Sequence, residues 1–247
     1  MKGLDRAGAG PKSVSKERKV TIWCNGFCMG VDRALVIGAT GGIGKAVAAQ
    51  VQERGGVVVK LSRAEQDFDL TDPASVARVM DPLHGPFDLI FVAVGILGSP
   101  EKSLDAIDAG QMAEVFAVNT TGPALILRHV PRLLPRTGRS VCAVLSARVG
   151  SIGDNKIGGW HSYRASKAAL NQIVHGAAIE MGRTHKQSIT VALHPGTVAT
   201  SFTADYAARH RTVTAEKAAT DLLDVIDGLT PVQSGGFYDY AGASIPW

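Results

Sequence analysis

Tyr163 and Lys167 are the residues whose types and spacing first suggest chemistry. They lie four positions apart in the stretch "SYRASK", and residues at this spacing share one face of a helix. The ordinary pKa of a tyrosine is about 10, and a neighbouring ammonium lowers that pKa because it favours the phenolate. Isolated Tyr–Lys pairs are more often solvated surface residues. A catalytic role therefore requires a partner elsewhere in the chain.

A glycine-rich turn is the partner that the sequence offers. The stretch "LVIGATGGIGKA" (35–46) runs from an expected strand into an expected helix. Its glycines follow the spacing G-x-x-x-G-x-G, one step different from the G-x-G-x-x-G dinucleotide fingerprint. They permit a tight turn and leave backbone N–H groups at the helix N-terminus open to a pyrophosphate. The residues expected to bind it are Gly38, Thr40, Gly42, Ile43 and Gly44. A P-loop is excluded because Ala46, not Ser or Thr, follows Lys45.

The end of the second expected strand, "KLSRAEQ" (60–66), bears on which dinucleotide is bound. NAD-binding proteins carry an Asp or Glu here, which accepts a hydrogen bond from the ribose 2′-OH. Ser62 and Arg63 occupy this place, and an arginine can pair with a 2′-phosphate. The sequence thus favours NADP, and Glu65 keeps NAD as the alternative.

Beyond Asp32 the chain alternates short β-branched runs with longer segments of helical period, which is typical of βαβ units and a parallel sheet. The expected strands are 33–37, 57–61, 88–94, 139–146, 188–194 and 236–241. The expected helices are 43–54, 73–81, 104–119, 121–134, 162–183 and 214–228. We predict an α/β fold, a single-domain doubly wound parallel sheet (Rossmann fold) in three α/β/α layers, over 33–247. Residues 1–32 are expected to be a disordered or leader-like extension.

Composition excludes several classes of protein. The chain has 247 residues, 45% of them hydrophobic, and a formal net charge of +4. Seven basic and three acidic residues up to Arg33 account for that charge, so the body carries no basic groove and we expect no nucleic acid partner. No apolar run approaches the about 20 residues of a membrane span. The three cysteines and the histidines show no metal-ligand spacing, so no metal is expected and the cytoplasm is the predicted location.

Ser146 and Asn119 are further candidates. Ser146 ends the strand "VCAVLS" at the carboxyl edge, where open α/β sheets bind ligands, so its hydroxyl could donate to a substrate oxygen. A serine that caps a turn is the alternative reading. Asn119 lies in a helical stretch just before "TTGP". Gly122 and Pro123 also allow it to be a helix-ending asparagine.

Five motifs occur in a fixed order: "GATGGIG", "VNTTGP", "LSARVG", "YRASKAAL" and "HPGTVATSF". With them the chain resembles the short-chain dehydrogenase/reductase family from about residue 33 to 247. The ending "SGGFYDYAGASIPW" looks like the C-factor-like branch of that family. The resemblance implies a catalytic tetrad of Asn119, Ser146, Tyr163 and Lys167, of which the last two also contact the cofactor.

Further cofactor contacts are implied by the same resemblance, at Asp69, Gly95, Pro195, Gly196 and Val198. Asp69 matches the residue that touches the adenine, and the "PGTV" segment (195–198) would lie beside the nicotinamide. The stretch "VAVG" (92–95) departs from the family's "NNAG", so Gly95 is retained while Ala93 removes side-chain support there. Asn119 would hold a water that relays protons from Lys167.

The function that follows is an oxidoreductase that transfers hydride between NADP(H) and a small carbonyl or alcohol substrate, with Tyr163 as general acid/base. A dinucleotide-binding signalling or sensor module with little turnover is the alternative. The family resemblance also implies a homodimer or homotetramer, through 162–183 and 121–134. A substrate-facing lid is expected over 197–213, with Phe202, Tyr206, Arg209 and His210.

Overall fold

One parallel sheet organises the computed structural model, which describes residues 30–203 and 212–247. Within these residues six strands lie in the order β2-β1-β3-β4-β5-β6, and each pairs with its neighbours in parallel. The strands are β1 (Arg33–Ile37), β2 (Val57–Leu61), β3 (Leu89–Val92), β4 (Ser140–Leu145), β5 (Ser188–His194) and β6 (Phe237–Asp239). The strand β2 lies on one side of β1, and the next strand along the chain, β3, lies on the other side of β1. The strand order therefore reverses beside β1, where such sheets bind their ligands.

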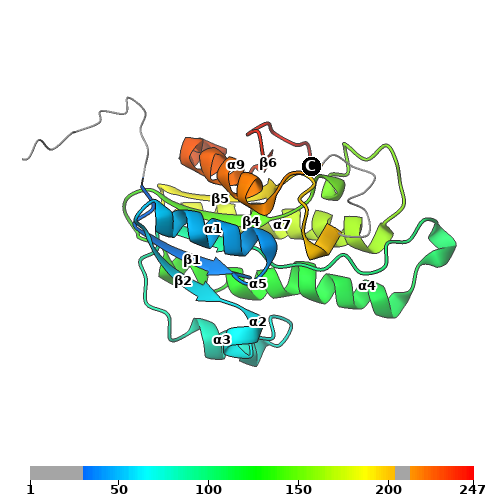
Figure 1. Ribbon diagram of the computed structural model, residues 1–247, viewed down its shortest axis with the longest axis horizontal. Helices are drawn as coiled ribbons and strands as arrows, with labels where there is room; N and C mark the ends of the chain where they lie inside the picture. The colour runs from blue at the N-terminus through cyan, green and yellow to red at the C-terminus, as the bar shows by residue number, and fades with distance from the viewer. Residues whose placement is uncertain (1–29, 204–211) are drawn as a thin grey trace, which may run out of the picture.

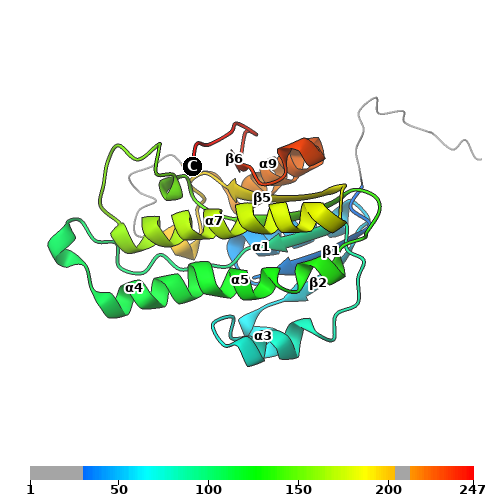
Figure 2. The same ribbon diagram turned by 180° about the vertical axis from the view of Figure 1, so that it is seen from behind.

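Helices cover both faces of the sheet, which confirms the three-layer prediction (Figures 1 and 2). On one face lie α1 (Gly42–Glu53) and α9 (Ala215–Gly228), and their apolar side chains join one core cluster. On the other face lie α3 (Pro73–Met80), α5 (Gly122–Leu127), α6 (Val130–Leu133) and α7 (His161–Thr184), which join a second cluster. The central strands β1, β3, β4 and β5 are buried almost throughout, as their near-continuous apolar sequence predicts.

The starts of the helices expected over 73–81 and 214–228 are confirmed, with Asp72 and Thr214 as their N-caps. Asp72 accepts hydrogen bonds from the N–H groups of Ala74 and Ser75 at 3.0 and 3.1 Å. Thr214 accepts from the N–H of Lys217 at 3.2 Å. Both therefore satisfy N–H groups that the first helical turn leaves without an intrahelical partner.

The segment 104–134 is more broken than the two expected helices. It contains η1 (Leu104–Ala106), α4 (Ala109–Phe116), the π-helical turn η2 (Ala117–Thr121), α5 and α6. The N–H of Gly122 bonds to the carbonyl oxygen of Ala117, five residues back. Because η2 joins α4 to α5, the helix does not end at Gly122 and Pro123, and the helix-ending reading of Asn119 is wrong.

Several short elements have no counterpart among the expected ones. They are α2 (Arg63–Gln66), η3 (Arg148–Gly150), η4 (Ser201–Thr203) and η5 (Pro231–Gln233). Each of these elements is too short for a periodic pattern of apolar residues in the sequence to indicate it. No helix within 30–203 or 212–247 is long and apolar enough to cross a membrane. The cytoplasmic location stays a prediction.

Candidate active site

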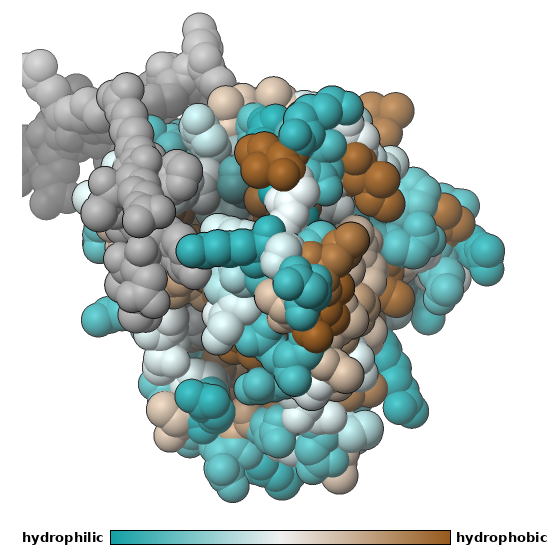
Figure 3. All heavy atoms as spheres, turned by 90° about the vertical axis from the view of Figure 1, so that its right-hand side faces the viewer, coloured by the Kyte–Doolittle hydropathy of each residue, from teal (hydrophilic) through white to brown (hydrophobic). Residues whose placement is uncertain are grey.

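The residues expected to do chemistry lie at the carboxyl edge of the sheet, on the loops that follow β1, β3, β4 and β5, on η2 and on the adjoining part of α7. This is the right-hand end of the molecule in Figure 1, toward which the strand arrows point. Figure 3 looks onto this end and shows apolar side chains scattered among hydrophilic ones. Exposed apolar residues on these loops include Leu104, Ile152 and Ile157.

The glycine-rich turn after β1 has the shape that a dinucleotide requires. Gly38 has φ +85, and a Cβ there would lie 2.3 Å from the carbonyl oxygen of Ala93. A Cβ on Gly44 would lie 2.3 Å from the carbonyl oxygen of Gly38, so strand and helix approach too closely for any side chain. The N-cap of α1, Gly41, makes no side-chain cap hydrogen bond. The first N–H groups of α1 are thus available to an anion, and the residues present fit a dinucleotide.

Two further expected contacts flank this turn. Thr40 is exposed beside it, and Ile43 packs against the core cluster under α1. From the other side Thr200 closes on Gly42, since a Cβ there would lie 2.6 Å from the Thr200 Cγ2 atom. The loop after β5 therefore borders the turn directly.

Ser62, Arg63 and Asp69 surround the end of β2. Ser62 is buried and caps α2, because its hydroxyl oxygen accepts from the N–H of Glu65 at 3.3 Å. Arg63 is exposed as the first residue of α2. One carboxylate oxygen of Asp69 accepts from the hydroxyl and N–H of Thr71, and these bonds hold the pKa of Asp69 below its ordinary value. Arg63 thus lies just beyond the end of β2.

Tyr163 and Lys167 both point from α7 into the protein. They are 6% and 3% exposed, respectively, so they are not surface residues. The Lys167 Nζ atom lies 6.0 Å from the centre of the Tyr163 ring and donates to the carbonyl oxygen of Leu145 at 3.1 Å. Among the described residues, the Tyr163 hydroxyl has no hydrogen-bond partner. A buried phenol with an unused hydroxyl can give its proton to a substrate.

Burial moves the pKa values of both groups. It raises the pKa of Tyr163 above its ordinary value and lowers the pKa of Lys167 to about 8. The expectation that Lys167 lowers the pKa of Tyr163 is therefore wrong for this structure. Loss of solvent around the phenol raises its pKa by more than the ammonium, which is not in contact with it, could lower it. Tyr163 is held protonated at neutral pH, in the state that acts as an acid.

Asn119 is fully buried and joins three segments. Its Oδ1 accepts from the N–H of Ile96 at 2.7 Å, and its Nδ2 donates to the Ile96 carbonyl and to the Ser166 hydroxyl at 2.8 and 3.1 Å. A Cβ on Gly95 would lie 3.1 Å from Asn119 Oδ1 and 3.4 Å from Lys167 Nζ. Gly95, Asn119 and Lys167 thus meet at one point.

The carbonyl oxygen of Asn119 cannot accept the α-helical hydrogen bond from four residues on, because that residue is Pro123, which has no N–H. The water-holding role that the family resemblance implies stays a prediction.

Ser146 lies at the end of β4, yet its hydroxyl is already engaged. It donates to Oδ1 of Asn171 at 2.6 Å, and Asn171 lies two helical turns beyond Tyr163 on α7. The Nδ2 atom of Asn171 is buried and has no partner among the described residues. Ser146 can donate to a substrate only if it gives up its bond to Asn171 Oδ1. Rotation of the Asn171 amide would permit this, because Nδ2 would then donate to the Ser146 oxygen.

The "PGTV" segment follows β5 at the same edge. Gly196 has φ +78, and a Cβ there would lie 3.0 Å from the Tyr240 ring. Val198 is buried and pairs with Val213 in a β-bridge. Pro195, half-buried, begins the segment. Of the expected lid residues, Phe202 lies 6.0 Å from the Tyr163 ring; Tyr206, Arg209 and His210 fall outside the described residues.

Several residues at the site were missed by sequence reasoning. Ser166 accepts from Asn119 and donates to the carbonyl oxygen of Tyr163. The Trp160 and Tyr163 rings pack edge to face with their centres 6.3 Å apart. Asn171 binds Ser146, and Glu101 binds Ser162. The only signal available beforehand was their position close to Tyr163 or on an expected loop, which many other residues share.

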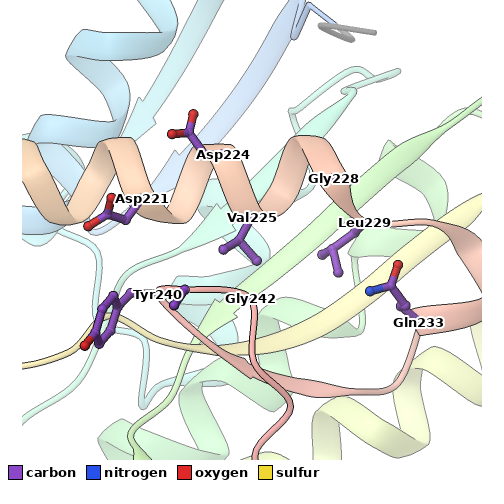
Figure 4. Close-up of a pocket in the computed structure, with 9 residues that line it drawn as sticks. Asp221, Asp224, Val225, Gly228, Leu229, Gln233, Tyr240 and Gly242 are labelled. Atoms are coloured by element: carbon purple, nitrogen blue, oxygen red, sulfur yellow. The ribbon is translucent and has the colours of Figure 1, made fainter. Parts of the chain in front are cut away.

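A surface pocket lies away from this site, between α9 and the turn after β6 (Figure 4). Asp221 and Asp224 line its α9 side, and Tyr240 lines the opposite side. The nine described residues that line it include none of the predicted site residues. Tyr240 connects the pocket to the site, because its ring lies against Gly196.

The fold and these motifs define a class of proteins. A family model described as enoyl-(acyl carrier protein) reductase matches residues 38–225, which include the glycine-rich turn, Asn119, Tyr163 and Lys167. The chain belongs to the short-chain dehydrogenase/reductase family.

Individual relatives support this assignment. 1-Hydroxy-2-glutathionyl-2-methyl-3-butene dehydrogenase of Rhodococcus sp. (strain AD45) is 33% identical over 228 residues, 86% of this chain and 98% of that protein. C-signal of Myxococcus xanthus is 38% identical over 167 residues, 66% of this chain and 94% of that protein. A putative short-chain dehydrogenase/reductase from Burkholderia multivorans with bound NADP has a TM-score of 0.76 at 25% identity, covering 88% of this chain and 100% of that one.

Proposed function

We propose that this protein is an NADP(H)-dependent oxidoreductase that interconverts a small carbonyl compound and its alcohol, with Tyr163 as the general acid and base. One observation carries the proposal. Tyr163 is buried at the carboxyl edge of the sheet with the centre of its ring 6.0 Å from Lys167 Nζ, and its hydroxyl makes no hydrogen bond within the described part of the chain.

Reduction of a carbonyl places negative charge on its oxygen, so the site must provide a proton there. When bound, a nicotinamide dinucleotide would supply the hydride. Tyr163 gives its proton to the oxygen, and the nearby Lys167 ammonium stabilises the phenolate that remains. The carbonyl oxygen of Asn119 holds a water that returns a proton by way of Lys167. Ser146 supplies a second hydrogen bond to the oxygen once it releases Asn171.

NADP is proposed over NAD because of Arg63. This arginine is exposed at the first position of α2, just beyond the edge strand β2, where its guanidinium could pair with a 2′-phosphate. The Burkholderia relative was solved with bound NADP, which supports the same choice. NAD is the alternative, with Glu65 as the acceptor for the ribose hydroxyls.

The test is NADPH oxidation, followed by absorbance, across a panel of small ketones and aldehydes. Tyr163→Phe is expected to lower kcat by at least about 100-fold, the usual size of a general-acid contribution, while NADPH binding is unchanged. Tyr238→Phe is the matched control, because within the described residues the Tyr238 hydroxyl bonds only to the Gln233 carbonyl, near the edge strand β6. Full turnover by Tyr163→Phe would contradict the mechanism, and a higher kcat/KM with NADH would contradict the cofactor choice.

A second candidate is a dinucleotide-binding signalling module with little turnover. It is supported by the 38% identity to C-signal of Myxococcus xanthus, because a shared fold does not fix a biological role. Calorimetry separates the two functions. Tight NADPH binding together with no turnover of any carbonyl in the panel would favour the signalling module.

A further inference from the structure

Glu101 is a buried carboxylate that the proposed chemistry does not use. It lies on the loop between β3 and α4 and is 4% exposed. Within the described residues it forms no ion pair with a lysine, arginine or histidine. A buried charge without an ionic partner depends on hydrogen bonds for its stability, so its hydrogen bonds indicate what it does.

Most of these bonds come from the first turn of α7. The N–H of Ser162 lies 3.3 and 3.2 Å from the two carboxylate oxygens of Glu101, and the Ser162 hydroxyl donates to Oε1. The N–H of Trp160 donates to the backbone carbonyl oxygen of Glu101 at 2.6 Å. Trp160 is the N-cap of α7 and its side chain provides no cap hydrogen bond. Glu101 therefore caps α7 from a loop far away in the sequence.

The charge of Glu101 suits this place. The N-terminus of a helix carries a partial positive charge that favours a carboxylate. Burial by itself would raise the pKa of Glu101, but hydrogen bonds from Ser162, from its own backbone and from Gln111 outweigh burial, and the pKa is lowered. The side chain is thus ionised at neutral pH.

Gln111 of α4 holds the other side of the loop. Its Nε2 donates to Oε1 of Glu101 at 3.4 Å and to the Ser99 carbonyl at 2.9 Å, and its Oε1 accepts from the Ser99 N–H at 3.0 Å. Glu101 is therefore fixed between α4 and α7. Movement of this loop would move the start of α7 as well.

The turn of α7 that Glu101 holds is the turn that carries the phenol. Tyr163 directly follows Ser162, and the Trp160 and Tyr163 rings pack edge to face with their centres 6.3 Å apart. Trp160 has φ 53 and ψ 41, a left-handed conformation that a non-glycine residue keeps only when its surroundings enforce it. The Trp160 N–H bond to Glu101 is one such restraint.

We propose that Glu101 is a positioning residue of the active site, which fixes the first turn of α7 so that the Tyr163 hydroxyl and the Trp160 ring stay at the carboxyl edge. The effect on turnover rests on the proposed oxidoreductase function. Displacement of a catalytic group by about 1 Å lowers rates by about 100-fold, so loss of this cap is expected to act on kcat.

Glu101→Ala and Glu101→Gln test the proposal, with Asp105→Asn as the control that removes an exposed carboxylate from the same loop. Glu101→Ala is expected to lower kcat at least about tenfold, and Glu101→Gln, which keeps one acceptor oxygen, less. The Kd for NADPH should change less than about twofold in both, because the glycine-rich turn lies on a different loop. Asp105→Asn should match the wild type.

Ser162→Ala extends the test by removing one partner of the carboxylate. Alone it should lower kcat, and in the Glu101→Ala background it should add no further loss, because the contact is already absent. If the two substitutions instead lowered kcat by independent factors that multiply in the double variant, the proposed contact would be overturned. Glu101→Gln decides the question if Glu101→Ala does not fold.

A readout that does not need turnover separates this inference from the proposed function. With Trp23→Phe and Trp247→Phe in the background, Trp160 is the sole tryptophan. Glu101→Ala should then make Trp160 fluorescence more accessible to acrylamide. That response in a protein inert toward every carbonyl would support the positioning role and reject the oxidoreductase function. Unchanged quenching with full kcat in folded Glu101→Ala would overturn the positioning role, as would a parallel loss of NADPH binding.

Discussion

Lys167 shows how strongly burial acts on a single group in this protein. The residue is 3% exposed, its ammonium donates to the Leu145 carbonyl at 3.1 Å, and loss of solvent lowers its pKa to about 8. The same burial raises the pKa of Tyr163. Desolvation thus disfavours the charged form of each, although a pKa of about 8 still leaves Lys167 mostly protonated at neutral pH.

Stability should depend on pH through Lys167. The pKa is 10.5 for an ordinary lysine and about 8 here, so as pH rises from about 8 to 10.5 the native state loses its proton before the unfolded chain does. Relative to Lys167→Met, the free energy of unfolding of the wild type should rise by about 3 kcal/mol across this window. Urea unfolding at both ends of the window measures it.

The control for that measurement is Lys45→Met, which removes an exposed lysine. Its urea unfolding, measured at the same two pH values, gives the effect of replacing an exposed lysine with methionine. If Lys167→Met shows a constant difference from the wild type, Lys167 is not desolvated in the native protein and its pKa is ordinary.

Sequence reasoning found Tyr163 and Lys167 because their spacing is a local property of a helix. Glu101 and Asn171 were not found, for a physical reason. Glu101 meets Ser162 across 61 positions of the chain, and this contact depends on how two loops fold over the sheet edge. Spacing in the sequence carries no information on such contacts. The burial that reverses the expected pKa shift of Tyr163 also results from tertiary packing.

At the scale of elements, the caps of the helices were the most predictable feature. Asp72 and Thr214 precede periodic apolar segments and have the side chains that accept from first-turn N–H groups. The π-helical turn η2 was not predictable, since no residue type marks the extra residue of such a turn. The helices α4 and α5 were accordingly expected with the wrong boundaries.

Removal of the Asp72 cap should weaken α3 without affecting the site. Asp72→Ala leaves the N–H groups of Ala74 and Ser75 without an acceptor, and we expect the free energy of unfolding to fall by about 1 kcal/mol. Chemical denaturation measures the loss. Asp72→Asn, which keeps a cap oxygen, should recover most of it, and kcat should not change in either. Equal stability of the Ala and Asn variants would show that the cap contributes nothing.

At the scale of the whole molecule, the single Rossmann-type sheet followed from the sequence because alternation of strands and helices admits few other arrangements. The association state did not follow, because the apolar positions of 162–183 fitted either a dimer face or the core. The structure shows which of these two roles some of the positions have. Ala177 packs against the core cluster, whereas Ile173 and Ile179 are 37% and 54% exposed.

A homo-oligomer that uses this exposed side of α7 remains our proposal. Ile179→Asp should shift sedimentation toward the monomer, because it places a charge on the apolar contact. Val57→Asp is the matched control, since Val57 is an exposed apolar residue on the edge strand β2, away from α7. A wild-type protein that sediments as a monomer would contradict the proposal.

The π-helical turn η2 sets a rule for how this chain can change in length. An α-helix rotates by about 100° per residue, so the extra residue in η2 offsets the faces of α4 and α5, which run as one rod in Figure 2. Asn119 thereby points at Ile96 while Ile126 points into the core. Deleting one residue between 117 and 121 would remove this offset. Either the Asn119 amide would then lose its bond to Ile96, or Ile126 would leave the core. Insertions and deletions between 117 and 121 are therefore expected to disrupt either the site or the core.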